Sequence, residues 1–136
     1  MKVRVLVADD DEESRGSLKD ALSPLGFEVV EAHDGAEALQ AIARALDGDA
    51  PRLDAVVLDV RMPALSGLGV LSVLRGHAPR VPTFVITGLV DPSIEALVMR
   101  LGGARVFRKP VDVDDLVGAL LDVAGVRSDC RHLSED

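Results

Sequence analysis

The chain has 136 residues, a formal net charge of −8 and one cysteine, and its 48% apolar and 28% charged residues are typical of one globular domain. The negative charge disfavours non-specific attraction to nucleic acid and favours a cation or a basic partner. A single cysteine excludes an internal disulfide, and no segment approaches roughly 18 uninterrupted apolar residues, so we expect a cytoplasmic protein and neither secretion nor membrane insertion.

The first part of the chain predicts a strand, a helix and a second strand. Residues 3–8 are short, apolar and β-branched, as in a buried strand, and an acidic run follows them directly. Residues 14–25 carry apolar side chains at helical spacing, and Gly26 ends this helix. Residues 27–32 follow Gly26, and we expect them to form the second strand.

The next two elements surround a prominent carboxylate. Asp34 followed by Glu37 has the layout of a capping box, which predicts the start of a helix that the segment 48–51 ends. Residues 55–58 are all apolar, as in a fully buried strand of a parallel sheet, and Asp59 follows them. Ligand-binding groups collect at such strand ends in open α/β sheets. Taken alone, Asp59 fits a turn cap equally well.

The second half of the chain continues the alternation. Three segments carry apolar residues at helical spacing, an apolar run between the first two is typical of a strand, and a short fifth strand is predicted before the last helix. The predicted elements are a helix at residues 66–74, a strand at 81–87, a helix capped by Asp91 and opened by Pro92, a strand at 105–108, and a helix at 113–124 capped by Asp112.

Five strands that alternate with five helices predict an α/β fold with a doubly wound parallel sheet covered on both faces. All strand ends then point the same way, so polar residues at the ends of different strands should meet in one pocket. These residues are Asp9, Asp10, Asp59, Thr87 and Lys109.

The residue types in this pocket indicate a chemistry. Three neighbouring carboxylates repel one another unless a cation lies among them, and oxygen-only ligands suit Mg²⁺ better than zinc. A carboxylate nucleophile, an ammonium and a hydroxyl are the remaining parts that phosphoryl transfer requires. The pattern therefore predicts a magnesium-dependent phosphoryl-transfer site.

The motifs around the pocket resemble those of CheY-like receiver domains of two-component response regulators. They are VLVADDDEESR from Val5, LDVRMPALSG from Leu58, VITG from Val85 and FRKP from Phe107. The resemblance covers nearly the whole chain, from Val3 to about residue 124. It implies a flavodoxin-like sheet of strand order 2-1-3-4-5, a receiver domain over residues 1–125 and a polar tail over residues 126–136.

The resemblance implies roles for the groups that would handle phosphate. Asp59 would accept a phosphoryl group from a histidine kinase, as one step of a phosphorelay. Lys109 would pair with Asp59 before phosphorylation and with a phosphoryl oxygen after it, and its bond to Pro110 would be cis. Thr87 would move toward the new phosphate. The domain would be a signalling phosphoacceptor with self-phosphorylation and autodephosphorylation activity only, and not an enzyme in the usual sense.

The resemblance also implies the ligands of Mg²⁺. Asp10 and Asp59 would bind the ion directly, together with the backbone carbonyl of Arg61. Asp9 would act mainly through a water molecule. The ion would neutralise charge that develops on the phosphoryl group.

The sequence departs from the family pattern at two positions. Val106 stands where the family often carries Tyr or Phe, whereas Phe107 lies one residue later, on the face of the strand that should meet the core. Gly88 stands where alanine is common after the switch hydroxyl. Since valine cannot exchange a buried ring position for an exposed one, the first departure predicts a weakened switch.

Two other functions stay open. One is a phosphorylation-independent interaction module with the receiver fold, for which Val106 is the best argument. The other is a haloacid-dehalogenase-type phosphatase. The motif of that family has a second Asp two positions after the nucleophile, where this chain has Arg61. For a receiver, the expected partners are a sensor histidine kinase or phosphotransfer protein, a downstream effector or missing output domain, and a second copy in a weak homodimer. We expect no direct contact with nucleic acid or membrane.

Overall fold

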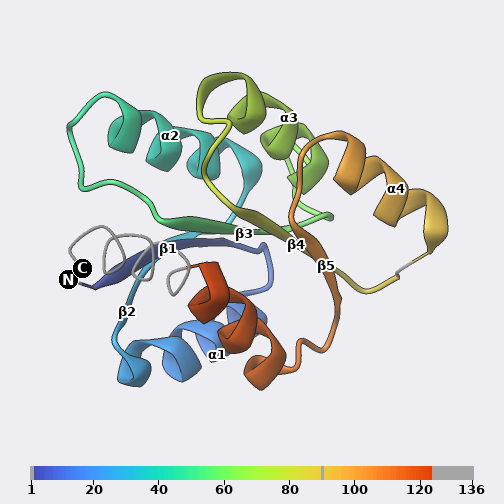
Figure 1. Ribbon diagram of the computed structural model, residues 1–136, viewed down its shortest axis with the longest axis horizontal. Helices are drawn as coiled ribbons and strands as arrows, with labels where there is room; N and C mark the ends of the chain where they lie inside the picture. The colour runs from blue at the N-terminus through green and yellow to red at the C-terminus, as the bar shows by residue number, and fades with distance from the viewer. Residues whose placement is uncertain (1, 90, 124–136) are drawn as a thin grey trace, which may run out of the picture.

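The sheet has five parallel strands in the order β2-β1-β3-β4-β5, and helices cover both of its faces (Figure 1). The structure is a computed structural model, which describes residues 2–89 and 91–123. The strands are β1 (Val3–Ala8), β2 (Phe27–Ala32), β3 (Ala55–Asp59), β4 (Thr83–Thr87) and β5 (Arg105–Arg108). The helices are α1 (Glu12–Leu22), α2 (Gly35–Leu46), α3 (Gly67–His77), α4 (Pro92–Arg100) and a last helix at 113–123, and η1 (Ser23–Leu25) is a 3-10 turn.

The predicted fold class and strand order are confirmed. Strands and helices alternate along the chain, and each neighbouring pair of strands is parallel. None of the helices within the described ranges has both the length and the apolar content needed to span a bilayer. The predicted tail at residues 126–136, and the domain boundary before it, lie outside the described residues.

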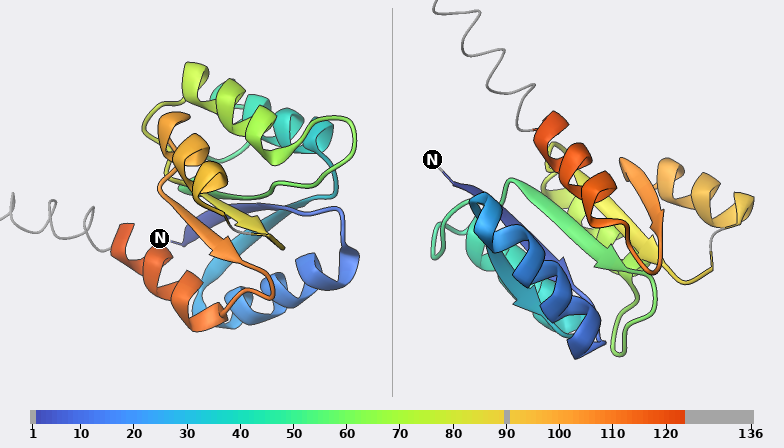
Figure 2. Two further views of the ribbon diagram at one scale, coloured as in Figure 1. Left: turned by 90° about the vertical axis from the view of Figure 1, so that its right-hand side faces the viewer. Right: turned by 90° about the horizontal axis from the view of Figure 1, so that it is seen from below.

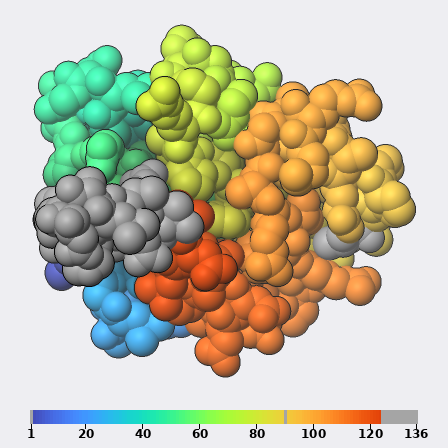
Figure 3. All heavy atoms as spheres, viewed as in Figure 1, coloured from blue at the N-terminus to red at the C-terminus, as the bar shows by residue number. Residues whose placement is uncertain are grey.

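The two faces of the sheet carry separate apolar clusters, because successive side chains of a strand point to opposite faces. In β3, Val56 and Leu58 pack with α2, α3 and α4, whereas Ala55 and Val57 pack with α1 and the helix at 113–123. Figure 2 shows the two helical layers from two further directions, and in Figure 3 α2, α3 and α4 occupy the upper and right-hand side. All five residues of β3 are buried, which explains its continuous apolar sequence.

The first helix differs from its predicted bounds at both ends. It begins at Glu12 because the Asp11 side chain accepts a hydrogen bond from a backbone N–H of the first turn at 3.2 Å. It ends at Leu22 because Pro24 has no N–H to donate within an α-helix, and the chain continues as a 3-10 turn. Gly26, at a φ of 95°, then ends the turn as predicted.

Two further boundaries also differ from the prediction. The fourth strand begins at Thr83 and not at Val81, because Pro82 lacks the N–H that a ladder requires. The third helix continues to His77, three residues beyond its predicted end, since no helix-breaking residue occurs before Pro79.

Three predicted helix caps are confirmed by hydrogen bonds from backbone N–H groups. The side chain of Asp34 accepts one at 2.8 Å, that of Asp91 at 2.9 Å and that of Asp112 at 3.2 Å. In the capping box, the Glu37 side chain accepts from the backbone N–H of His33 at 3.0 Å. These caps fix the starts of helices on both faces of the sheet.

Gly67 lets α3 begin directly against the end of β3. Its N–H donates to the carbonyl of Val60 at 3.1 Å, and a Cβ atom at this position would overlap the backbone carbonyl of Asp59. Only glycine permits such a close approach between the two backbones. The start of α3 therefore helps to fix the backbone that carries Asp59.

We expect Gly67→Ala to lower the free energy of unfolding by about 1–3 kcal/mol, because the added methyl group must push α3 away from β3. Gly76→Ala, in the same helix, is the matched control, because a Cβ atom at Gly76 would meet no other atom within 4 Å. It should be neutral or raise the free energy of unfolding by up to about 1 kcal/mol. Urea unfolding of both variants measures the difference. Equal stabilities would contradict the prediction.

Candidate functional site

The structure brings three carboxylates together at the carboxyl ends of β1 and β3. Asp9 and Asp10 follow β1, and Asp59 is the last residue of β3. Ala8 and Leu58 are register partners in these adjacent strands, so Asp9 and Asp59 lie at the same level of the sheet. Each of the three carboxylates offers an oxygen within 4.8 Å of the others. Asp9 and Asp59 are buried, whereas Asp10 is exposed to solvent.

Lys109 places an ammonium group between the two buried carboxylates. Its Nζ lies 2.7 Å from Oδ2 of Asp59 and 3.1 Å from Oδ2 of Asp9. The Lys109 backbone N–H donates to the carbonyl of Thr87 at 2.8 Å, which holds the end of β5 against β4. The bond from Lys109 to Pro110 is cis, as the family resemblance implied. Lys109 thus supplies the positive charge that two buried carboxylates require.

The pKa values of the two buried carboxyl groups shift in opposite directions, although Lys109 lowers both. Burial raises the pKa of Asp59, and the hydrogen bond from Lys109 offsets this only in part. Burial also raises the pKa of Asp9, but the N–H of Asp11 and further hydrogen bonds outweigh it, so this pKa falls below its usual value. For Lys109, burial lowers the pKa, but both carboxylates oppose this and leave it above its usual value.

Arg61 and Thr87 lie at the rim of the carboxylate cluster. The backbone N–H of Arg61 donates to Oδ1 of Asp59 at 3.1 Å, so each oxygen of Asp59 has a donor. The Thr87 hydroxyl, at the end of β4, both donates to and accepts from the backbone of Leu89 at 3.3 Å. Thr87 is therefore paired with its own loop in this state and must break two long hydrogen bonds to reach another partner.

The strand β5 confirms the predicted orientation of Phe107. Phe107 is buried and packs against Phe84, with ring centroids 6.0 Å apart, on the face covered by α1. Val106 is half-buried on the opposite face, where it packs with the cluster beneath α4. The guanidinium of Arg105 lies 4.5 Å from the centre of the Phe107 ring. Phe107 is thus a core residue and does not take the place of a ring at position 106.

One residue beside the cluster was missed by our sequence analysis. Arg15, in the first half of α1, donates from Nη1 to the backbone carbonyl of Asp9 at 2.7 Å. The acidic run before α1 drew attention to its carboxylates, whereas a single arginine on a helix predicts only a solvated charge. Its contact depends on how α1 packs beside the end of β1.

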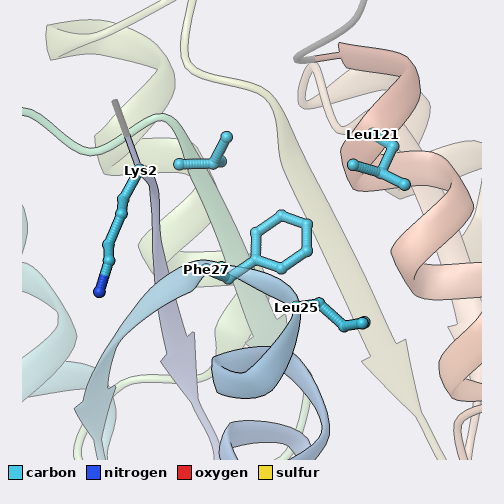
Figure 4. Close-up of a pocket in the computed structure, with 6 residues that line it drawn as sticks. Lys2, Leu25, Phe27 and Leu121 are labelled. Carbon is cyan, nitrogen blue, oxygen red and sulfur yellow. The ribbon is translucent and has the colours of Figure 1, made fainter.

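An apolar depression lies far from the carboxylates, at the amino ends of β1 and β2 (Figure 4). Val3 and Phe27, the first residues of these strands, line it together with Leu25 and Leu121. The carboxylates lie at the other ends of the strands. The depression is therefore no part of the candidate site.

Comparison with known proteins gives one consistent result. A family model described as the response regulator receiver domain matches residues 5–121. Response regulator MprA of Mycobacterium tuberculosis is 40% identical over 120 residues, which cover 88% of this chain and 50% of the relative. The chain therefore spans about half the length of the curated relatives it matches.

Solved structures agree with the family model. The receiver domain of the Francisella response regulator 1452 is 27% identical, with a TM-score of 0.80 over 90% of this chain and 96% of that one. Chemotaxis protein CheY4 of Vibrio cholerae is also 27% identical, with a TM-score of 0.79 over 90% of this chain and 99% of that one. Both share the arrangement of strands and helices described above.

We expect Asp59→Asn to raise the free energy of unfolding of the metal-free protein at pH 7 by roughly 1 kcal/mol. The pKa of Asp59 is raised on folding, so its ionised form costs stability, and this cost disappears as the pH falls toward about 4. Asp9→Asn should have the opposite sign, because ionised Asp9 contributes stability that is lost only as the pH falls through its lowered pKa.

Urea unfolding in EDTA, between about pH 4 and pH 8, measures both variants against the unaltered protein. The two stability differences should have opposite signs at pH 7. The Asp59→Asn difference should shrink as the pH falls to about 4, whereas the Asp9→Asn difference should persist over this range. Stability differences of the same sign at neutral pH would show that folding does not shift the pKa values of Asp9 and Asp59 in opposite directions.

Proposed function

This chain belongs to the response regulator receiver domains, which are signalling domains of two-component systems, and from that premise we propose that Asp59 accepts a phosphoryl group from a histidine kinase. One observation carries the proposal: the buried Asp59 carboxylate lies 2.7 Å from the Lys109 ammonium, at a strand end beside two further carboxylates. This arrangement combines a nucleophile with a cation that can afterwards hold an anionic oxygen.

The acidic cluster has the donor set of a magnesium site. All its side-chain ligands are carboxylate oxygens, and exposed Asp10 leaves room for the waters that Mg²⁺ retains in proteins. Asp10, Asp59 and the backbone carbonyl of Arg61 would hold the ion, and Asp9 would contact it mainly through water. When bound, Mg²⁺ supplies positive charge that offsets the repulsion between carboxylates and phosphoryl oxygens.

The chain's own residues perform the transfer step. A carboxylate oxygen of Asp59 forms the new bond to phosphorus as the bond from phosphorus to the donor's imidazole nitrogen breaks, and the imidazole keeps that electron pair. Lys109 then exchanges its contact with Asp59 for one with a phosphoryl oxygen. Thr87 gives up its hydrogen bonds to Leu89 and donates a hydrogen bond from its hydroxyl to a second phosphoryl oxygen.

The proposal extends to the reactions and partners of the domain. The same groups would support self-phosphorylation from small phosphodonors and autodephosphorylation by water. A sensor histidine kinase or phosphotransfer protein would supply the phosphoryl group in the cytoplasm. Residues 1–125 would form the receiver and residues 126–136 a tail, and a downstream effector, an output domain or a second copy in a weak homodimer would read the signal.

A phosphorylation-independent interaction module is the second candidate function. Val106 favours it, because a half-buried valine offers no large group that could change the surface when Thr87 moves. The two candidates differ in whether phosphorylation occurs at all, which the following experiment decides.

We expect the unaltered protein to gain the mass of one phosphate when it is incubated with acetyl phosphate and Mg²⁺. Asp59→Asn should abolish this gain, because an amide cannot act as the nucleophile. Asp20→Asn, which removes an exposed carboxylate from α1, is the control and should be labelled normally. Intact-protein mass spectrometry gives the result. Labelling of Asp59→Asn, or full labelling in excess EDTA, would disprove the assignment.

We also expect a muted switch. A ligand shifts a two-state equilibrium only by its differential affinity for the two states, and Val106 has little bulk to reposition. On addition of beryllofluoride and Mg²⁺, amide chemical shifts should change strongly at Gly88, Leu89 and Asp91 and weakly across β5. Val106→Tyr should enlarge the changes across β5. Changes in β5 of the unaltered protein as large as those at Gly88 would count against the idea.

A further inference from the structure

Arg15 connects the ends of β1 and β2 beside the acidic cluster. Its Nη1 donates to the backbone carbonyl of Asp9 at 2.7 Å, and its Nε donates to Oε1 of Glu31 at 3.2 Å. Only 14% of the side chain is exposed, although it carries a full charge. A guanidinium can serve both acceptors at once because its donors have a fixed planar arrangement.

The carbonyl that Arg15 binds belongs to the peptide group between Asp9 and Asp10. The Asp9 N–H donates to the carbonyl of Ala32 at 3.0 Å, which extends the pairing of β1 with β2 by one step. The register of β1 with β2 ends at Ala8 and Ala32, and the carbonyl of Asp9 accepts from Arg15. Since the peptide group is planar, a fixed carbonyl also fixes the direction in which the chain enters Asp10.

Asp10 depends on this anchor more than its neighbours do. The side chain of Asp9 is wholly buried and is held by Lys109 and by the N–H of Asp11. Asp10 is exposed, so packing does not restrict its side chain in the same way. The backbone on both sides of Asp10 therefore constrains where its carboxylate lies, through the Asp9 carbonyl held by Arg15 and the Asp11 N–H held by Oδ1 of Asp9.

We propose that Arg15 is a positioning residue for the metal-binding carboxylates and holds Asp10 in place through the carbonyl of Asp9. This inference rests on the proposed function, in which Asp10 binds Mg²⁺ directly. Residues that orient metal ligands through hydrogen bonds commonly affect metal affinity as strongly as some ligands do. Arg15 would do so without touching the ion.

Positioning and charge predict opposite effects when Arg15 is removed. Loss of a positive charge makes the pocket more negative, which should tighten Mg²⁺ binding, whereas loss of the hydrogen bond loosens Asp10 and should weaken it. The charge of Arg15 is already opposed by Glu31 at 3.2 Å, so its effect on the pocket is small. Weaker Mg²⁺ binding is therefore the expected net result.

Lys19 provides a matched control. It lies one turn further along α1 and contacts the same Glu31, with Nζ 3.3 Å from Oε2, but its side chain is 48% exposed. Arg15→Ala and Lys19→Ala each remove one positive charge beside Glu31. Only the first removes a hydrogen bond to Asp9.

The test is a titration of the full chain with Mg²⁺ alone, followed by amide chemical shifts, so that no phosphorylation is involved. Arg15→Ala should raise the dissociation constant of Mg²⁺ about tenfold, which is the lower end of the effect usually seen when a group that orients a metal ligand is lost. Lys19→Ala should change it by less than about twofold, as for an exposed ion pair. Arg15→Lys should fall between Arg15→Ala and the unaltered protein, since an ammonium can restore one hydrogen bond. Thermal melts in EDTA establish that each variant is folded.

Equal dissociation constants for Arg15→Ala and Lys19→Ala, or tighter binding in both, would overturn the inference and leave the proposed function intact. If Arg15→Ala is unfolded at the temperature of the titration, Arg15→Lys is compared with Lys19→Ala by the same criterion. An Asp10→Asn variant that binds Mg²⁺ as well as the unaltered protein would overturn both the inference and the proposed function.

Discussion

Two carboxylates that are almost wholly withdrawn from water share one ammonium group at the carboxyl end of the sheet. Asp9 and Asp59 could not both be ionised there without Lys109, whose Nζ lies 3.1 Å from the first and 2.7 Å from the second. The three residues come from the ends of β1, β3 and β5, so the ion pairs form only when the strands from β1 to β5 in the sheet order have assembled. The site therefore depends on the fold, and its charge balance depends on a residue 50 positions from Asp59.

The strand order of the sheet brings residues that are far apart in the sequence close together. Parallel strands joined by right-handed crossovers bring their carboxyl ends to one edge, and the order β2-β1-β3-β4-β5 puts β1 and β3 side by side. Gly67 and Lys109 then fix the pocket from two sides, one through the start of α3 and the other through its hydrogen bond to Thr87. Packing on both faces buries most of the apolar side chains of the strands between two layers of helices.

Much of this arrangement could be predicted because strand ends are visible in the sequence. The strand at residues 27–32 was predicted exactly, since Gly26 and the cap at Asp34 bound it, and the gathering of polar residues at one edge followed from the alternation of elements. The 3-10 turn at Pro24 and the pairing of Thr87 with Leu89 could not be predicted, because they depend on local backbone geometry. Arg15 was missed because its contact requires α1 and the end of β1 to be placed in three dimensions.

The burial of β3 also bears on how the domain moves. A strand that pairs on both sides and is covered on both faces opens only with much of the sheet, so the amide hydrogens of β3 should be among the slowest of the described residues to exchange. The segment after β4 is different, since Gly88 and Leu89 are exposed and the backbone of Leu89 is held by two long hydrogen bonds to Thr87. The carboxylate of Asp59 is thus attached to a strand that seldom opens, whereas the loop after β4, which would respond to its phosphorylation, opens at little cost.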